Sequence, residues 1–234
     1  MNNFDWKQLF NPEFYITLQL DGVQIGLFVV LFIVFAETGL FAGFFLPGDS
    51  LLFLSGIYSD QLMACLHDTG NSFINLVILT ALVSAAGILG NIFGYWFGKK
   101  SGDFLYERPD SMLFKKKYLY QAHDYYEKHG ALAIVFSRFL PVLRTFSPII
   151  AGIVHMSRRK FMFYNIVGSV AWSFSLIFGG HYLQATLMKY FGFDMKTHIE
   201  AIVIGIVLVT TLPVIYKLVF GKATDRSSEG EQQS

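Results

Sequence analysis

The chain alternates between long apolar stretches and short polar linkers, and three of the apolar stretches are long enough to cross a membrane as helices. A transmembrane helix needs about 20 predominantly apolar residues. The three stretches are Ile74–Gly98, Phe161–Leu183 and about 199–220, where the run Ala201–Phe220 is interrupted only by Lys217 near its end. We therefore predict three full transmembrane helices.

Two further apolar regions, at about 22–57 and 131–156, are interrupted by prolines and charged residues. The first contains Glu37 and Pro47-Gly48-Asp49, and the second contains Arg138, Pro141, Arg144 and Pro148. A broken backbone at membrane depth is tolerated only where protein or water surrounds it. We therefore predict that each region is a re-entrant helical hairpin, with helix breaks at Pro47, Gly48, Pro141 and Pro148. The alternative for the first region is an ordinary span followed by a surface loop, with Pro47 and Asp49 outside the membrane.

The basic residues form three clusters, which bear on the second hairpin. Seven lie within Lys99–Gly130, three at 158–160 and three within Lys217–Arg226. Cytoplasmic loops of membrane proteins carry an excess of Lys and Arg. If the region 131–156 enters the membrane and returns, all thirteen of these basic residues share the cytoplasmic side. The charge pattern therefore favours a hairpin there and predicts a cytoplasmic C-terminus.

These elements predict an all-α polytopic membrane protein with a single domain at 1–223 and a disordered cytoplasmic tail at 224–234. Their order is hairpin, span, basic linker, hairpin, span and one extra span. The two hairpins would open to opposite sides of the membrane, as in the inverted repeats of secondary transporters, whose broken segments mark the substrate site. Only hydropathy and charge support this repeat, because no residue-by-residue repeat is evident.

Composition excludes several other classes of protein. Charged residues make up 15% of the chain, whereas soluble domains usually carry about 25%. The net charge of +1 gives no indication of nucleic-acid binding. The single cysteine, Cys65, excludes an intramolecular disulfide framework and a thiolate metal cluster. The histidines have no metal-ligand spacing, so we expect neither a metal nor another cofactor.

The candidate functional residues are the four charges in the two hairpins, Glu37, Asp49, Arg138 and Arg144. A charge at the centre of a membrane helix costs about 2.5–3.5 kcal/mol on insertion scales, so it usually serves a function. The planar fork of arginine suits phosphate, which makes Arg138 and Arg144 candidate substrate ligands. A carboxylate in low dielectric binds a proton more readily than one in water, which makes Glu37 and Asp49 candidate proton-coupling groups. The alternative is that the acids and arginines form purely structural ion pairs.

Three fragments, spread over about Ala36 to Gly168, resemble the DedA family of bacterial inner-membrane proteins, related to the SNARE-associated or VTT-domain proteins. They are Phe35-Ala36-Glu37 with Phe44-Phe45-Leu46-Pro47-Gly48-Asp49; Gly90, Gly94-Tyr95, Gly98-Lys99 and Gly102; and Phe136-Ser137-Arg138-Phe139-Leu140-Pro141 with Arg144, Pro148 and Ala151-Gly152. One departure is Asn91, where we expect many relatives to have an aspartate. This departure weakens a proton-relay role at that position and leaves the hairpins unaffected.

The resemblance implies a two-hairpin inverted-repeat fold in the bacterial inner membrane. It also implies translocation of a lipid between leaflets, notably undecaprenyl phosphate, with coupling to the proton gradient. The family's functional acids and arginines correspond to Glu37, Asp49, Arg138 and Arg144. The expected partners are therefore a phosphate-bearing membrane lipid and protons, and assembly into a homo-oligomer stays open.

Three other functions remain open from the sequence. The first is a proton-dependent antiporter of ions or small molecules, although paired arginines favour an anion over a cation. The second is a non-transporting scaffold for envelope or division machinery. The third is a membrane enzyme such as a lipid phosphatase, which needs a nucleophile or a general-base histidine near the arginines. No histidine follows Ser137-Arg138 before His155, so we do not expect an enzyme.

Overall fold

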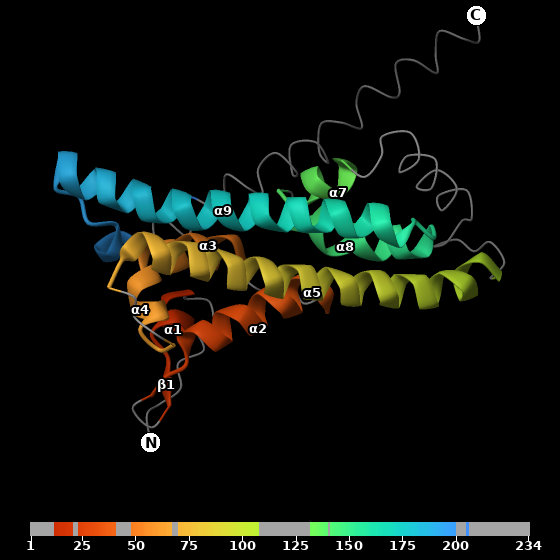
Figure 1. Ribbon diagram of the computed structural model, residues 1–234, viewed down its shortest axis with the longest axis horizontal. Coiled ribbons are helices and arrows are strands. Elements are labelled where there is room, and N and C mark those ends of the chain that lie inside the picture. Colours follow the sequence, from red (N-terminus) through yellow and green to blue (C-terminus); the bar gives the residue numbers. More distant parts are fainter. Residues whose placement is uncertain are drawn as a thin grey trace, which may run out of the picture.

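Helices form almost all of the described part of the chain (Figure 1). The computed structural model describes residues 12–20, 23–40, 48–66, 70–107, 132–139, 141–199 and 205. Within these residues the only sheet is a two-residue antiparallel ladder between β1 (Gln19–Leu20) and β2 (Val23–Gln24), with Leu20 opposite Val23. The predicted all-α architecture is thus confirmed, apart from this short ladder near the N-terminus.

Two long helices, α5 (Ser72–Glu107) and α9 (Arg158–Phe191), form the body of the molecule. They pack side by side and run in opposite directions (Figure 1). The segments Ser72–Gly102 and Arg158–Phe191 are long and apolar enough to cross a membrane. They contain the first two predicted spans. The third predicted span and the polar tail lie outside the described residues, apart from Ile199 and Gly205.

The pattern of exposure on α9 is the reverse of that on a helix of a water-soluble protein. Phe163 and Phe174 are more than half exposed, at 61% and 51%, whereas Asn165 and Ser169 are fully buried. A helix of a water-soluble protein places its polar residues outward and its apolar residues inward. Large apolar side chains facing outward, with polar ones packed inside, are the arrangement expected when the surrounding solvent is lipid.

Four shorter helices pack against the two long ones. They are α2 (Gly26–Gly39), α3 (Gly48–Ile57), α7 (Leu132–Ser137) and α8 (Pro141–Ile153). Helices α2 and α8 contact α5, whereas α3 and α7 contact α9. None of the four reaches the about 20 residues needed to span a membrane. They occupy the two regions in which we predicted hairpins.

Glycines allow α8 to lie directly on α5, and α3 directly on α9. A side chain at Gly98 of α5 would collide with the backbone of Ile149, and one at Gly152 of α8 would collide with the backbone of α5. Gly56 of α3 and Gly180 of α9 make the same kind of close approach to each other's helices. Small residues at such contacts are the usual means by which membrane helices approach closely.

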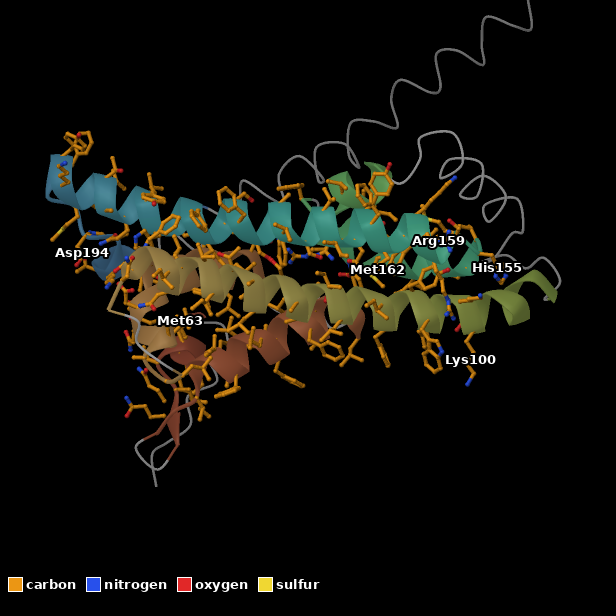
Figure 2. The ribbon with its side chains drawn as sticks, in the orientation of Figure 1. Met63, Lys100, His155, Arg159, Met162 and Asp194 are labelled. Atoms are coloured by element: carbon orange, nitrogen blue, oxygen red, sulfur yellow. The ribbon has the colours of Figure 1, made fainter. Side chains whose placement is uncertain are left out.

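The two ends of the pair of long helices carry different residues and different short helices. Figure 2 shows Lys100, His155 and Arg159 at one end of the molecule, and Met63 and Asp194 at the other. The second end carries three short helices: α1 (Pro12–Ile16), α4 (Ser59–Met63) and the 3-10 helix η3 (Met195–His198). The carboxylate of Asp194 accepts hydrogen bonds from the backbone N–H of Lys196 and from the amide of Gln184. These bonds lower the pKa of Asp194 and fix the turn between α9 and η3.

Candidate functional site

The four charged residues singled out in the sequence lie at the facing ends of the short helices. Glu37 is in the last turn of α2 and Asp49 is in the first turn of α3. Arg138 follows the end of α7, and Arg144 is in the first turn of α8. Glu37, Arg138 and Arg144 are at most 5% exposed. The structure thus brings buried charges from both predicted hairpins into one cluster.

Arg144 joins three of the short helices through its guanidinium group. Its two terminal nitrogens donate separately, Nη1 to Asp49 and Nη2 to Glu37. Asp49 also accepts a hydrogen bond of 3.0 Å from the indole nitrogen of Trp172 on α9. Both carboxylates of the cluster are therefore bound to the same arginine.

Arg138 has no carboxylate partner among the described residues. Its Nη2 donates to the side-chain oxygen of Asn165 over 2.8 Å, and its buried Nε has no partner there. Gly87 on α5 and Gly168 on α9 lie against the side chain of Arg138, where larger residues would crowd it. The fold therefore makes room for a buried cation and leaves its charge uncompensated by any described acid.

The ring of Trp172 lies near both arginines. The guanidinium carbon of Arg138 lies 5.8 Å from the centroid of the Trp172 ring, and that of Arg144 lies 5.3 Å from it. An aromatic face attracts a cation at such distances, more strongly when both are removed from water. This attraction offsets part of the cost of holding two like charges near each other.

Two asparagines connect α5 and α9 at the same level. Asn91 donates to the side-chain oxygen of Asn165 over 2.8 Å, so that this oxygen accepts from both Asn91 and Arg138. Asn165 in turn donates to the backbone oxygen of Ile88. The sequence singled out Asn91 only as a departure from the family pattern, and Asn165 was missed. A signal existed, since Asn-Ile-Phe-Gly at 91–94 recurs as Asn-Ile-Val-Gly at 165–168.

The residues predicted to break the helices behave differently from one another. Gly48 begins α3, and it lies so close to the Glu37 carboxylate that a side chain at this position would displace that carboxylate. Pro141 begins α8, a position at which proline is tolerated. Helix α8 continues through Pro148 to Ile153, so the break expected at Pro148 is not found. Pro47 lies outside the described residues.

The described residues include no group of three or more His, Cys, Asp or Glu side chains that could hold a metal ion. The acids of the cluster, Glu37 and Asp49, are bound to Arg144. The chemistry open to this cluster is an exchange of the groups bound to its arginines. An anion can bind Arg138 directly, and it can bind Arg144 when the carboxylates release it.

Lipid-facing helices around a buried charge cluster define a helical membrane protein. The model of the VTT domain matches residues 16–182. The chain belongs to the VTT-domain family, which includes the DedA proteins. The resemblance seen in the sequence is thus confirmed.

Similar proteins support this assignment over most of their length. Protein DedA of Escherichia coli K12 is 33% identical over 196 residues, which cover 83% of each chain. An uncharacterized membrane protein of Mycobacterium leprae is 32% identical over 222 residues, or 94% of this chain and 92% of that protein. Inner membrane protein YghB of Salmonella typhimurium is 35% identical over 171 residues, 72% of this chain and 68% of that protein. No solved structure matches the chain significantly.

Proposed function

We propose that the protein translocates a phosphate-bearing lipid between the leaflets of the bacterial inner membrane, with undecaprenyl phosphate as the first candidate and with coupling to protons. The observation that carries this proposal is Arg138, a guanidinium that is 3% exposed and has no described acidic partner. A buried, unpaired cation is costly in a membrane protein. Such a group is expected where an anionic substrate arrives to compensate it.

A phosphate group suits the two arginines better than an inorganic cation or a neutral molecule does. Guanidinium groups donate parallel hydrogen bonds to phosphate oxygens and stay charged at every physiological pH. Arg138 and Arg144 lie over the same ring of Trp172, so one phosphate could bridge them. The apolar outer faces of the long helices leave the hydrocarbon tail of a lipid in the bilayer.

The proton enters the proposal through Glu37 and Asp49. In the observed state both carboxylates hold Arg144. Protonation of either one removes a negative charge from the cluster and weakens its hold on Arg144, which frees this arginine for phosphate. Deprotonation restores the ion pairs and expels the anion. The ion pairs of Arg144 with Glu37 and Asp49 are therefore the deprotonated state of the proposed cycle.

The contact pattern of the helices supports an inverted repeat with a hairpin in each half. The first half consists of α2, α3 and α5, and the second of α7, α8 and α9. The largest contacts correspond when the two halves are exchanged, α2–α5 to α7–α9 and α3–α9 to α8–α5, whereas the smaller α2–α8 contact has no counterpart of similar size. The tetrads at 91–94 and 165–168 also correspond, one in each half. We infer that the charge cluster lies where the two re-entrant hairpins meet.

The proposed orientation places the basic ends of α5 and α9 and the C-terminus in the cytoplasm. Lys99 and Lys100 lie about two turns before the end of α5. They are toward the same end of the helix pair as Arg158, Arg159 and Lys160 at the start of α9, since the two helices are antiparallel. The positive-inside rule assigns such clusters to the cytoplasm. YghB, one of the similar proteins, is described as an inner membrane protein.

Binding of the lipid to the purified protein tests this proposal. We expect undecaprenyl phosphate to bind in detergent, and undecaprenol, which lacks the phosphate, to bind at least about tenfold more weakly, a difference of about 1.4 kcal/mol. Arg138→Gln should abolish the difference. Lys189→Gln, which removes an exposed charge at the other end of α9, should preserve it. Equal binding of the two lipids would favour an antiporter of small ions or a scaffold.

A further inference from the structure

A second site lies between α5 and α9, toward their basic ends and away from the four charges of the central cluster. The two helices enclose an open pocket of about 230 Å³. Helix α5 lines it with Ile92, Tyr95, Trp96 and Lys99, and α9 lines it with Arg158, Phe161 and Met162. In Figure 2, Met162 lies along α9 between the centre of the molecule and the end that carries Lys100 and Arg159.

The spacing of these residues makes the pocket a continuous groove. The four positions on α5 follow an i, i+3, i+4, i+7 pattern and the three on α9 follow i, i+3, i+4, so each set lies along one face of its helix. Since the helices are antiparallel, Lys99 and Arg158 lie at the same end of the groove. The distance along α5 from Ile92 to Lys99 is about 10 Å, because each residue of an α-helix rises about 1.5 Å.

The inner surface of the groove is apolar. The rings of Tyr95 and Phe161 stack with their centroids 4.4 Å apart. The hydroxyl of Tyr95 donates to the backbone oxygen of Met156, so this polar group is already satisfied. Trp96 is 51% exposed and Met162 is 36% exposed, and together they form the open rim. The groove therefore offers a hydrocarbon surface that opens to the side.

Lys99 and Arg158, the two basic residues at one end of the groove, have no acidic partner among the described residues. Neither Lys99 nor Arg158 takes part in a described ion pair. A basic side chain at the end of a membrane helix lies at the level of the lipid headgroups, where it attracts anionic lipids. An apolar groove with two free cations at one end is complementary to a lipid with a hydrocarbon chain and an anionic phosphate.

We infer that this groove binds one anionic lipid of the adjacent leaflet, with its phosphate between Lys99 and Arg158 and its chain along Trp96 and Met162. This site is distinct from the central cluster, because none of its residues belongs to that cluster. Its inner end is nevertheless close to the cluster, since Phe161 lies one helical turn before Asn165. The inference does not rest on the proposed transport, because a lipid can occupy the groove whether or not the protein moves lipids.

Lipid selectivity of the purified protein tests this inference, with charge-matched variants as controls. Native mass spectrometry in detergent measures the binding of phosphatidylglycerol and of zwitterionic phosphatidylcholine. We expect a preference of the wild-type protein for phosphatidylglycerol, and Lys99→Gln combined with Arg158→Gln should weaken that binding about tenfold, or about 1.4 kcal/mol. The control combines Arg159→Gln with Lys160→Gln, because the ammonium group of Lys100 lies 5.4 Å from the ring centroid of Trp96, at the rim of the groove. This control removes the same charge from adjacent exposed positions outside the groove and should bind like the wild type.

Equal weakening by both double variants would show a diffuse basic surface and overturn the proposed site. The absence of selectivity in the wild type, or unchanged binding in the first double variant, would overturn it as well.

A second pair of variants tests the hydrocarbon part of the groove without removing a charge. Met162→Trp should fill the groove and lower the occupancy of phosphatidylglycerol several-fold. Phe163→Trp, at an exposed neighbouring position outside the groove, should leave it unchanged. Millimolar inorganic phosphate should not displace the lipid, because phosphate has no chain to bury. Displacement by phosphate, or equal binding by both tryptophan variants, would contradict a lipid site.

Discussion

At the scale of single residues, the buried charges of this protein are unevenly paired. Arg144 holds both Glu37 and Asp49, whereas Arg138 is held by the neutral side chain of Asn165. An even distribution of one acid to each arginine would compensate every charge locally and leave no group for a substrate. In the proposed function, this distribution leaves Arg138 to bind the anion and allows a proton to release Arg144.

Arg144→Lys should impair function although it retains the positive charge. The two terminal nitrogens of Arg144 reach different carboxylates, and a single ammonium group cannot reproduce this fork. We expect lipid flux in proteoliposomes to fall at least about tenfold, equivalent to about 1.4 kcal/mol. The exposed substitution Arg159→Lys is the control. Wild-type flux in the Arg144→Lys variant would count against direct binding of phosphate by this residue.

Asn165→Asp should weaken phosphate binding by giving Arg138 a carboxylate partner. The side-chain oxygen of Asn165 already accepts from Arg138 over 2.8 Å, so the new charge would form an ion pair with Arg138, with loss of the hydrogen bond that Asn165 donates to the backbone oxygen of Ile88. We expect the affinity for undecaprenyl phosphate, measured by equilibrium binding, to fall at least about tenfold while the protein stays folded. Asn71→Asp makes the same change at an exposed turn before α5 and should have no effect. Unchanged affinity in Asn165→Asp would mean that Arg138 does not bind the substrate.

The sequence identified the charged members of the cluster, because a charge within an apolar stretch is conspicuous and costly. Which acid pairs with which arginine was not predictable, since that depends on how two distant segments meet. Asn165 was missed because a single uncharged residue in a span is unremarkable. Trp172 was missed as a member of the cluster, although its indole nitrogen donates a hydrogen bond to Asp49.

At the scale of the helices, close backbone contacts at glycines determine where the charged ends meet. Gly98 and Gly152 allow α8 to lie on α5, and Gly56 and Gly180 allow α3 to lie on α9. These contacts hold α3 and α8 directly against the long helices, and their first turns carry Asp49 and Arg144. The long and short helices were predicted from the length of the apolar stretches and the positions of the prolines. The points at which α8 contacts α5 and α3 contacts α9 were not predictable, since a glycine pattern shows only that some close contact exists. The helix through Pro148 shows the limit of proline as a sign of a break.

Gly98→Ala should destabilise the protein, because the added methyl group would overlap the backbone of Ile149. Overpacking usually costs about 1–3 kcal/mol, and here a rigid backbone must move. Gly179→Ala is the matched control, since no heavy atom lies within 4 Å of the added group and alanine favours a helix over glycine. We expect thermal unfolding in detergent to occur at a lower temperature for Gly98→Ala only. Equal unfolding temperatures for the two variants would show that the α5–α8 contact is looser than described.

At the scale of the whole molecule, the proposed inverted repeat divides the described helices into two halves, with the charge cluster between them. An arrangement of this kind allows one half to rock against the other around a fixed site, which is how inverted-repeat transporters alternate access. Hydropathy predicted the two long apolar helices that the structure describes, α5 and α9, whereas the hairpins and the repeat stay predictions. The tetrads at 91–94 and 165–168 match each other in sequence, and the hydrogen bond between Asn91 and Asn165 joins them.

The proposed orientation predicts that a reporter fused after Phe220 lies in the cytoplasm, because the basic clusters are expected on that side. A phosphatase reporter that is active only outside the cytoplasm should therefore be inactive at this position. A fluorescent protein that folds only in the cytoplasm should be bright. The opposite pair of results would contradict both the orientation and the proposed return of the second hairpin.

Flux of labelled undecaprenyl phosphate across proteoliposomes of purified protein, measured with and without a pH gradient, tests the central claim most directly. We predict flux that depends on the protein and that the gradient accelerates. Glu37→Gln, which keeps the shape of the side chain but cannot change its charge, should make the flux independent of the gradient, whereas Asp60→Asn, an exposed acid on α4, should not. No flux above that of empty liposomes would contradict lipid translocation, and an unaltered response to the gradient in Glu37→Gln would contradict the proton role of Glu37.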